Sequence, residues 1–290
     1  MSEIKDKCVI TCALTGVLTN PAKYPVPVTP EEMAKEARRA ADAGATIVHC
    51  HFRSPKKGQG HMMTWDPEEV AAVVDAVRAE VPEMIINMST GLPGPDVSGP
   101  LACLRRCKPH MAALNAGSLN YMKINADGTW AWPPTLFDNP IEKIQKYLTV
   151  MNEENVVPEC ECFDTGIVRS VGLYEKNGMM HQPIHISFVM GVASGMPADL
   201  DLFPILIRQL SPGTQWQTII VGRSEIWAVH RRAAELGGNV RTGLEDTFYL
   251  PSGERASSNG PLIEALVKMV REAGREPANF AEARKIALHA

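Results

Sequence analysis

Short apolar segments alternate along this chain with longer segments of helical periodicity, and no other feature of the sequence restricts its fold as strongly. The strand candidates are rich in β-branched residues and cover residues 8–14, 46–51, 84–88, 111–115, 157–163, 183–189, 215–221 and 239–243. The helix candidates cover residues 30–43, 67–80, 141–154, 166–176, 200–210, 224–236 and 261–273. Because a crossover segment follows each strand, we expect the strands to pair in parallel.

Eight parallel strands favour closure into a barrel. We therefore predict an α/β fold, a (β/α)8 TIM barrel formed by a single domain over residues 1–290, with an extra C-terminal helix after Pro277. An open doubly wound sheet would alternate in the same way, but no G-x-G-x-x-G turn follows the first strand. Residues 115–139 are the one long irregular segment, which predicts a lid or an interface arm.

Charge and cysteine content restrict the class of protein. The chain has 29 Lys and Arg against 33 Asp and Glu, and this net charge of −4 argues against nucleic acid as the main partner. The apolar run near the N-terminus is too short to span a membrane and lacks a small-residue cleavage site, so we expect no signal peptide and no membrane anchor. Seven cysteines without a C-x-x-C pair favour reduced thiols and a cytoplasmic location.

The second strand candidate ends with two histidines, in Ile47-Val48-His49-Cys50-His51. Side chains alternate along a strand, so both imidazoles are expected in the barrel lumen and Cys50 in the helix layer. Two neutral imidazoles at this spacing are a common first half of a divalent metal site, which needs a third ligand, and zinc suits them well. The alternative is that one histidine is a hydrogen-bonded core residue while the other faces a helix.

Arg241 lies within the eighth strand candidate, where an unpaired cation would be costly. We therefore expect it to contact a carboxylate. Glu159 and Glu161 are the candidates, because they share one face of the fifth strand, and Glu161 is nearer the carboxyl end at which TIM barrels carry their sites. A buried structural ion pair and a catalytic relay both fit this pattern.

Further polar residues follow two strands. Glu245 and Asp246 come just after Gly243, so one side chain can ligate a metal while the other stays free as a base; a solvated acidic loop is the alternative. Ser89 and Thr90 end the third strand, where small hydroxyl groups suit a carboxylate or enolate oxygen.

Several of these segments together resemble the β-keto acid cleavage enzyme family, which includes 3-keto-5-aminohexanoate cleavage enzyme. The resemblance is specific in combination and runs in order along nearly the whole chain. It is carried by residues 10–16, the stretch around His49 and His51, Ser89-Thr90-Gly91, residues 158–164, Gly222-Arg223 and residues 240–247.

The resemblance implies a zinc-dependent TIM barrel, usually a homotetramer, that condenses a β-keto acid with acetyl-CoA and releases acetoacetate and a new acyl-CoA. It also implies roles for individual residues. The implied metal ligands are His49, His51 and Glu245; the implied base is Asp246, oriented by Arg241 and a fifth-strand glutamate, Glu161 being the nearer; and Ser89 would assist Asp246 and touch the substrate.

Two positions depart from the aminohexanoate enzyme that the chain resembles. Leu18 replaces the acidic residue that recognises the substrate ammonium group, and Ala113 replaces a hydroxyl residue. Both departures disfavour an ammonium-bearing substrate. For acetyl-CoA, the sequence offers Arg223, which follows the seventh strand at a predicted helix start, and Arg53, Lys56 and Lys57 as further basic candidates.

Three other functions fit parts of the pattern. A metal-dependent hydrolase of the amidohydrolase type also uses H-x-H in a barrel, although on the first strand, and His185 on the sixth strand matches its pattern. A metal-dependent aldolase would work without acetyl-CoA. A binding barrel with a structural metal is the third possibility, but structural zinc normally has four protein ligands and the sequence offers three.

Overall fold

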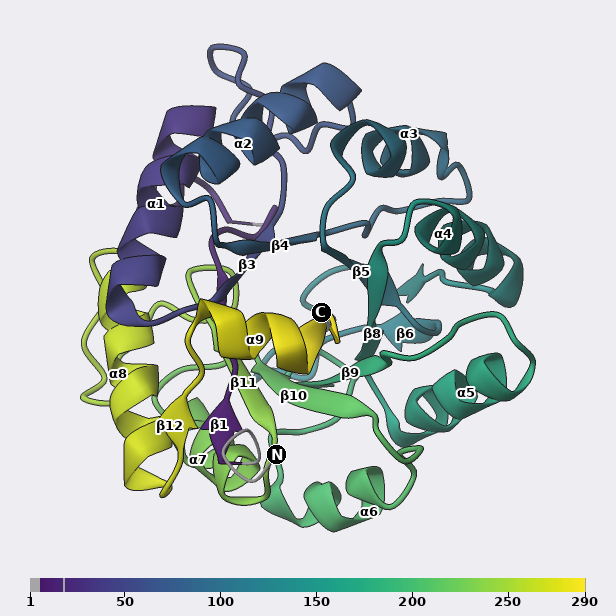
Figure 1. Ribbon diagram of the computed structural model, residues 1–290, viewed down its shortest axis with the longest axis vertical. Helices are drawn as coiled ribbons and strands as arrows, with labels where there is room; N and C mark the ends of the chain where they lie inside the picture. Colours follow the sequence, from purple (N-terminus) through teal and green to yellow (C-terminus); the bar gives the residue numbers. More distant parts are fainter. Residues whose placement is uncertain (1–5, 18, 290) are drawn as a thin grey trace.

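The computed structural model describes residues 6–17 and 19–289. Eight strands pair in parallel and close into a barrel, in the order β10, β11, β2, β3, β4, β5, β8, β9 (Figure 1). They are β2 (Ile10–Ala13), β3 (Ile47–Cys50), β4 (Ile85–Met88), β5 (Met111–Asn115), β8 (Val157–Cys162), β9 (His185–Met190), β10 (Gln215–Ile220) and β11 (Asn239–Thr242). The predicted (β/α)8 barrel is confirmed, and each barrel strand lies within a predicted segment except β9, which extends one residue beyond it to Met190.

Helices surround the barrel (Figure 1). They are α1 (Pro30–Ala43), α2 (Pro67–Glu80), α3 (Ser98–Cys107), α4 (Ile141–Glu153), α5 (Thr165–Lys176), α6 (Phe203–Ile207), preceded by the 3-10 turn η1 (Leu200–Leu202), α7 (Ile226–Glu235) and α8 (Asn259–Glu272). The helix α3 is not predicted from the sequence. Its ten residues include Gly99 and Pro100, and no side chain caps its start, so the usual signals of a helix start are missing.

The outer faces of the strands and the inner faces of the helices form one large apolar core. Cys50 is buried in this core, among the apolar side chains between barrel and helices, as its position between two lumen residues predicts. A second, smaller core fills the amino end of the lumen, where Val9, Ile47 and Ile85 meet Ile286. The barrel is therefore packed at its amino end, and polar side chains occupy the rest of its lumen.

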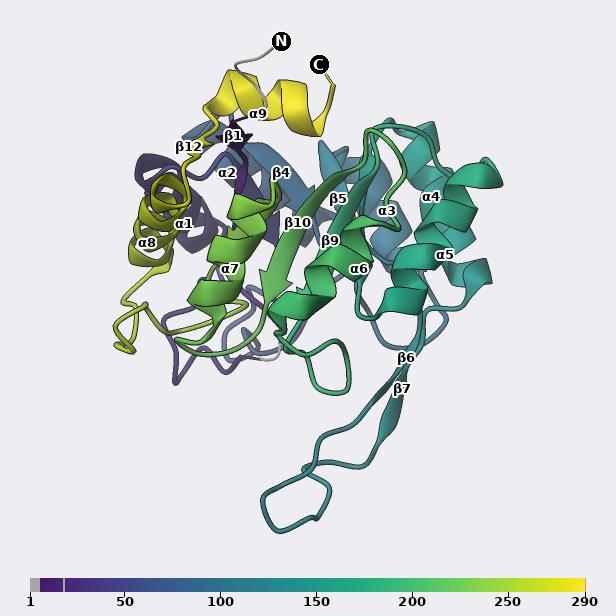
Figure 2. The same ribbon diagram turned by 90° about the horizontal axis from the view of Figure 1, so that it is seen from below.

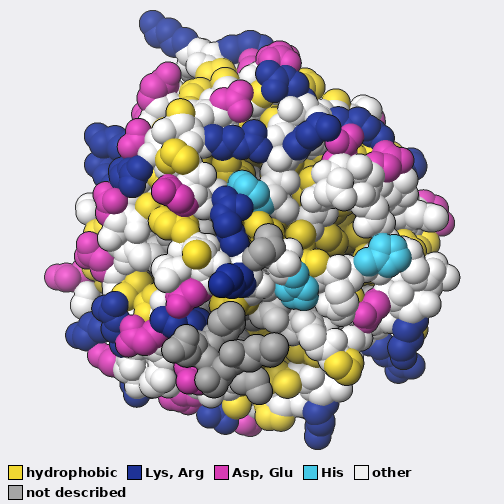
Figure 3. Space-filling model, viewed as in Figure 1, with side chains coloured by type: hydrophobic (Ala, Val, Ile, Leu, Met, Phe, Trp, Pro, Cys, Tyr) yellow, Lys and Arg dark blue, Asp and Glu magenta, His cyan; other side chains and the backbone are white. Residues whose placement is uncertain are grey.

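A terminal helix, α9 (Phe280–Ala287), lies across the amino end of the barrel (Figures 1 and 2). It is the helix expected after Pro277. The strand β12 (Glu276–Pro277), paired with β1 (Lys7–Cys8), connects it to the start of the chain. Figure 3 shows this closed end, where Lys and Arg side chains are interspersed with Asp and Glu around the rim.

The segment expected to be irregular, residues 115–139, instead contains an antiparallel hairpin. Its strands are β6 (Leu119–Tyr121) and β7 (Thr135–Phe137), and it projects from the carboxyl end of the barrel (Figure 2). We call residues 119–137 the arm. The arm lacks an alternating apolar pattern because most of its side chains are exposed, which explains why the strands were not predicted. Across the described part of the chain, no helix has the length and apolar content needed to cross a membrane.

Candidate active site

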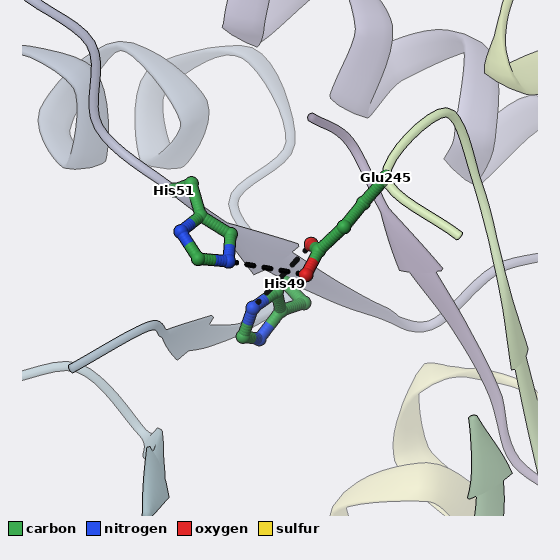
Figure 4. Close-up of side chains that lie close together, drawn as sticks. All are labelled: His49, His51 and Glu245. Atoms are coloured by element: carbon green, nitrogen blue, oxygen red, sulfur yellow. Dashed lines mark hydrogen bonds and ion pairs between the residues drawn. The ribbon is translucent and has the colours of Figure 1, made fainter. Parts of the chain in front are cut away.

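Two histidines and a glutamate converge at the carboxyl end of the barrel (Figure 4). His49 is the third of the four residues of β3, His51 follows β3, and Glu245 comes three residues after β11. The Nε2 atom of His51 lies 3.1 Å from Glu245 Oε1, and the Nε2 atom of His49 lies 3.6 Å from Oε2. One ligand atom from each of the three residues lies within 4.8 Å of the others. The structure thus brings together the residues that the sequence nominated as metal ligands.

The donor atoms of this cluster suit a divalent cation. Both ring nitrogens of His49 and the Oε2 atom of Glu245 are buried without a hydrogen-bond partner among the described residues, a costly arrangement that a bound cation would relieve. Burial, together with nearby Arg241, holds the pKa of His49 well below its usual range, so the imidazole is neutral and free to ligate. Two nitrogens and one carboxylate form the donor set of an open zinc site.

Glu245 is the anionic member of the cluster. Burial opposes its ionisation, but the charges of His51 and Arg241 outweigh burial and hold its pKa well below the usual range. Its side chain is 19% exposed and that of His51 is 14% exposed, whereas His49 is buried. A ligand would therefore reach the cluster from the carboxyl end of the barrel.

Arg241 contacts three carboxylates in the lumen beside this cluster. It donates to both oxygens of Asp246, with Nε–Oδ2 and Nη2–Oδ1 distances of 3.1 Å. It also lies 2.9 Å from Glu245 Oε1 and 3.3 Å from Glu161 Oε1. The guanidinium group is buried, so these contacts compensate a charge that would otherwise be unstable there.

Three carboxylates around one guanidinium leave an excess of negative charge. Burial raises the pKa of Asp246 to about 7, although Arg241 lowers it in part. In the same way, burial raises the pKa of Glu161 to about 8. A carboxylate whose pKa lies near neutrality can both accept and return a proton, which is the property required of a general base.

The backbone after β11 directs Glu245 and Asp246 apart. Gly243 lies against β2, where an added Cβ atom would be 2.1 Å from the carbonyl oxygen of Ala13. Asn259, the first residue of α8, accepts a hydrogen bond from the amide of Leu244 and donates one to the carbonyl of Leu14. These contacts hold the segment rigidly, so Glu245 points to the histidines while Asp246 points to Arg241.

Glu159 occupies a deeper layer of the lumen and has no ion pair with Arg241 in the described structure. Its carboxylate accepts hydrogen bonds from Asn87 Nδ2, Ser187 Oγ and, at 2.7 Å, Gln217 Nε2. The structure therefore selects Glu161 as the fifth-strand partner of Arg241. This polar layer is not predicted from the sequence, although Asn87 and Ser187 lie within predicted strands, on the faces that point inward.

Of the remaining predicted site residues, Ser89 and Arg223 follow barrel strands at the carboxyl end. Ser89 follows β4 and is buried, but no hydrogen bond joins its hydroxyl group to Asp246 in the described structure. Arg223 follows β10 and is exposed, with its guanidinium carbon 5.2 Å from the centre of the Tyr249 ring. Leu18, on which the prediction against an ammonium-bearing substrate partly depends, lies outside the described residues. Ala113 is buried beside Glu159 in the sheet.

Two basic or titratable residues do not have the positions expected of them. Arg53 is buried and donates to Thr15 Oγ1 and to the carbonyl groups of Gly60 and Thr19, so its guanidinium group holds loops together and is not available to CoA. His185 makes no hydrogen bond to the candidate metal ligands in the described structure. Its Nε2 atom lies 2.7 Å from the carbonyl oxygen of Ala287, at the amino end of the barrel. This position argues against the amidohydrolase pattern, which needs that histidine at the metal.

Comparison with known proteins places this arrangement in a family. The model of the β-keto acid cleavage enzyme family matches residues 7–288. A 3-keto-5-aminohexanoate cleavage enzyme from Fusobacterium nucleatum is 34% identical over 97% of each chain. A 3-oxoadipate:acetyl-CoA acetyltransferase from Cupriavidus necator is 31% identical over 96% of this chain and 94% of the relative.

Solved structures support the fold. The apo structure of ObcA matches with a TM-score of 0.73 and 18% sequence identity. The match covers 90% of this chain and 65% of the ObcA chain, so this protein spans about two thirds of that structure. At this level of identity the likeness concerns the barrel alone.

Proposed function

The chain belongs to the β-keto acid cleavage enzyme family, and from this premise we propose that it transfers an acyl group between a β-keto acid and acetyl-CoA. One observation carries the proposal: the three candidate metal ligands lie beside the Asp246–Arg241 pair at the open end of one barrel. The relatives named for acetyl-CoA-dependent reactions support the co-substrate. The chain would act as a single catalytic domain.

A divalent cation, zinc by its donor set, would be held by His49, His51 and Glu245 and would supply Lewis acidity toward the oxygens of the keto acid. Asp246 acts as the base that removes a proton from C2 of the keto acid. Arg241 holds the Asp246 carboxylate with two hydrogen bonds, and Glu161 fixes the guanidinium group from the other side. Ser89, at the end of β4, would contact the substrate.

The bond changes follow from the proton transfer. The C2 carbanion attacks the thioester carbonyl of acetyl-CoA, a carbon–carbon bond forms, and the CoA thiolate leaves. The thiolate then attacks the C3 carbonyl, the C2–C3 bond breaks, and the acyl group of the keto acid departs as a new acyl-CoA. The remaining fragment is acetoacetate, whose C2 carbanion takes back the proton held by Asp246, so the base ends as it began.

We also propose that the protein is a homo-oligomer, a tetramer by its family resemblance, and that Arg223 contributes to CoA binding. The arm supports the oligomer, because it exposes four large apolar side chains near the tip and base of one hairpin: Met122, Ile124, Trp130 and Leu136. The seven cysteines are unpaired and buried, which agrees with a reducing compartment such as the cytoplasm.

The proposal is tested by incubating the purified protein with zinc, acetyl-CoA and a panel of β-keto acids that includes 3-oxoadipate and 5-amino-3-ketohexanoate. We expect acetoacetate to form only when both acetyl-CoA and a keto acid are present. The variant Asp246→Asn should lose about 10²- to 10⁴-fold in kcat, the usual contribution of a positioned base. Asp42→Asn, an exposed carboxylate on α1, is the matched control and should retain activity.

Two results would overturn the proposal. Cleavage of a keto acid without acetyl-CoA would indicate an aldolase or a hydrolase. Absence of acetoacetate with every keto acid of the panel, from a folded and metal-loaded protein, would exclude the acyl transfer itself. A strong preference for 5-amino-3-ketohexanoate would contradict only the narrower prediction drawn from Leu18 and Ala113.

A further inference from the structure

Two arginines share one tyrosine at the rim of the barrel, next to the candidate active site. Arg223 follows β10 and Arg255 lies in the loop after β11, and both guanidinium groups lie against the ring of Tyr249, at 5.2 and 6.0 Å from its centre. Arg255 also lies 5.7 Å from the centre of the Tyr24 ring. Tyr24 in turn stacks on Phe248, with ring centres 4.5 Å apart. We call these five residues the rim cluster.

The backbone around the rim cluster is firmly connected. Leu250 donates to the carbonyl of Glu254 at 2.8 Å, and Ala256 donates to that of Phe248 at 2.9 Å, so residues 248–256 form a narrow turn in which Tyr249 and Arg255 face each other. Trp227 Nε1 donates to the carbonyl of Tyr249. The two loops that carry the arginines are therefore held in fixed relation.

The two guanidinium groups have no side-chain ion pair within the described part of the chain. The carboxylate of Glu225 contacts Arg223 through the backbone amide, from which it accepts a hydrogen bond at 3.0 Å. Stacking on an aromatic face holds a guanidinium group in place while its N–H donors stay free for a ligand. Two exposed cations that share one ring repel each other, and an anion bound between them would remove this repulsion.

The rim cluster adjoins the residues proposed to carry the reaction. Tyr249 follows Asp246 by three residues, and Thr247 Oγ1 donates to the carbonyl of Gly222, which directly precedes Arg223. A polyanion bound at the rim could thus remain attached to a group that reacts beside Asp246, provided that a flexible chain connects the two. Acyl-CoA has this form: a phosphorylated adenosine diphosphate, a long pantetheine arm and a thioester.

We propose that Arg223 and Arg255, held against Tyr249, bind phosphate groups of the adenosine 3′-phosphate 5′-diphosphate part of acyl-CoA. This inference rests on the proposed function and extends it to a second arginine and an aromatic platform. The other basic loop is a weaker candidate, because Lys56 is paired with Glu69 at 3.3 Å and Arg53 is buried. Guanidinium groups also suit phosphate better than ammonium groups do, since they can donate two parallel hydrogen bonds.

The first experiment compares acetyl-CoA with acetyl-pantetheine, a thioester that lacks the adenosine phosphates. In Arg223→Gln and Arg255→Gln, the ratio of kcat/KM for acetyl-CoA to that for acetyl-pantetheine should fall about tenfold each, the change that corresponds to ~1.4 kcal/mol of lost binding. The matched control is Arg208→Gln, an exposed arginine at the end of α6 without an ion pair among the described residues, which should leave the ratio as in the wild type. An unchanged ratio in both rim variants would overturn the proposal.

A second measurement separates this site from the reaction. Calorimetry at low salt follows the binding of adenosine 3′,5′-bisphosphate to the wild-type protein and to the variant that carries both substitutions. We expect binding to the wild type and at least a tenfold weaker binding to the double variant, with the same thermal unfolding midpoint. Equal binding by the two proteins, or no binding by the wild type, refutes the site. This result is independent of turnover, so it stands even where no keto acid is cleaved.

Discussion

At the scale of single residues, Asp246 is subject to two opposing influences. Burial favours its protonated form, whereas the Arg241 guanidinium group favours its charged form. Because burial has the larger effect, the pKa of Asp246 is raised to about 7. Glu245, its neighbour in the chain, is pulled the other way by His51 and Arg241. Adjacent carboxylates therefore have different surroundings, because the backbone after Gly243 turns one toward the imidazoles and the other toward the arginine.

Gly243 offers a test of this local geometry. An added methyl group would lie 2.1 Å from the Ala13 carbonyl oxygen and 2.7 Å from its carbon, so β11 and β2 would have to separate. We expect Gly243→Ala to lower the free energy of unfolding by about 2–4 kcal/mol and to weaken metal binding, because Glu245 moves with the backbone. Chemical denaturation and metal titration measure the two effects.

Gly172 in α5 is the control for this substitution, because an added Cβ there meets no atom within 4 Å. Gly172→Ala should be neutral or stabilising by up to ~1 kcal/mol, since alanine favours a helix. If Gly243→Ala keeps the stability and the metal affinity of the wild type, the contact with Ala13 does not fix the position of Glu245.

Strand alternation in the sequence predicts that His49, His51 and Arg241 face the lumen. Glu245 lies beyond the end of its strand, so its role as a ligand is implied by the family resemblance and not by alternation. The sequence does not show the contact of Glu161 with Arg241: it favours Glu161 over Glu159 only by its place nearer the carboxyl end, and the stagger of the closed barrel brings it beside Arg241. Nor does it reveal Asn259, whose partners Leu14 and Leu244 belong to distant segments.

At the scale of elements, α9 closes the end of the barrel opposite to the site. Its packing depends on apolar contacts and on the hydrogen bond between His185 Nε2 and the carbonyl oxygen of Ala287. Burial lowers the pKa of His185 to about 4, and the charge of His289 acts in the same direction. The histidine is therefore neutral in the folded protein at any pH above about 4.

This buried histidine predicts how stability depends on pH. Below the ordinary histidine pKa of about 6.5, the unfolded chain binds a proton at His185 that the folded chain does not bind, so stability is lost as the pH falls from about 6.5 toward 4. The contribution of this group is ~2 kcal/mol by pH 5. In urea unfolding between pH 7 and pH 5, His185→Gln should show a shallower loss of stability than the wild type. Parallel curves for the two proteins would contradict this explanation.

The elements of the barrel are predictable because strands and crossover helices have different periodicities that repeat along the chain. Thr29 and Pro30 begin α1, where Thr29 and Glu32 form a capping box as their residue types suggest. The arm is different, since its strands pair with each other and have no apolar face toward the core. Apolar residues alternate along a strand when one of its faces is buried, so a hairpin that projects from the barrel shows no such alternation in its sequence.

At the scale of the whole molecule, the arm is the feature that a single barrel does not explain. Ile124 and Trp130, opposite each other near its tip, are 58% and 52% exposed. A cavity of about 440 Å³ lies between the arm and the loop after β9, lined in part by Met122, Trp130 and Ser194. Exposed apolar groups at this density favour contact with a second copy of the chain.

We therefore expect Ile124→Glu and Trp130→Glu, combined, to convert the oligomer into smaller species in sedimentation velocity experiments. Leu173→Glu is the matched control, because Leu173 is an apolar residue of similar exposure on α5, which is not part of the arm. The control should sediment as the wild type does. A wild-type protein that is monomeric at micromolar concentration, or variants that remain oligomeric, would exclude the arm as the interface.

The proposed function depends on one cation held at the open end of the barrel by three side chains. Anomalous diffraction at the zinc absorption edge, from crystals of the zinc-loaded protein, tests this directly. We predict one peak per chain, about 2.0–2.2 Å from a nitrogen of His49, a nitrogen of His51 and an oxygen of Glu245, with no fourth protein ligand. No peak at these residues, or a peak closed by four protein ligands, would contradict the proposed chemistry.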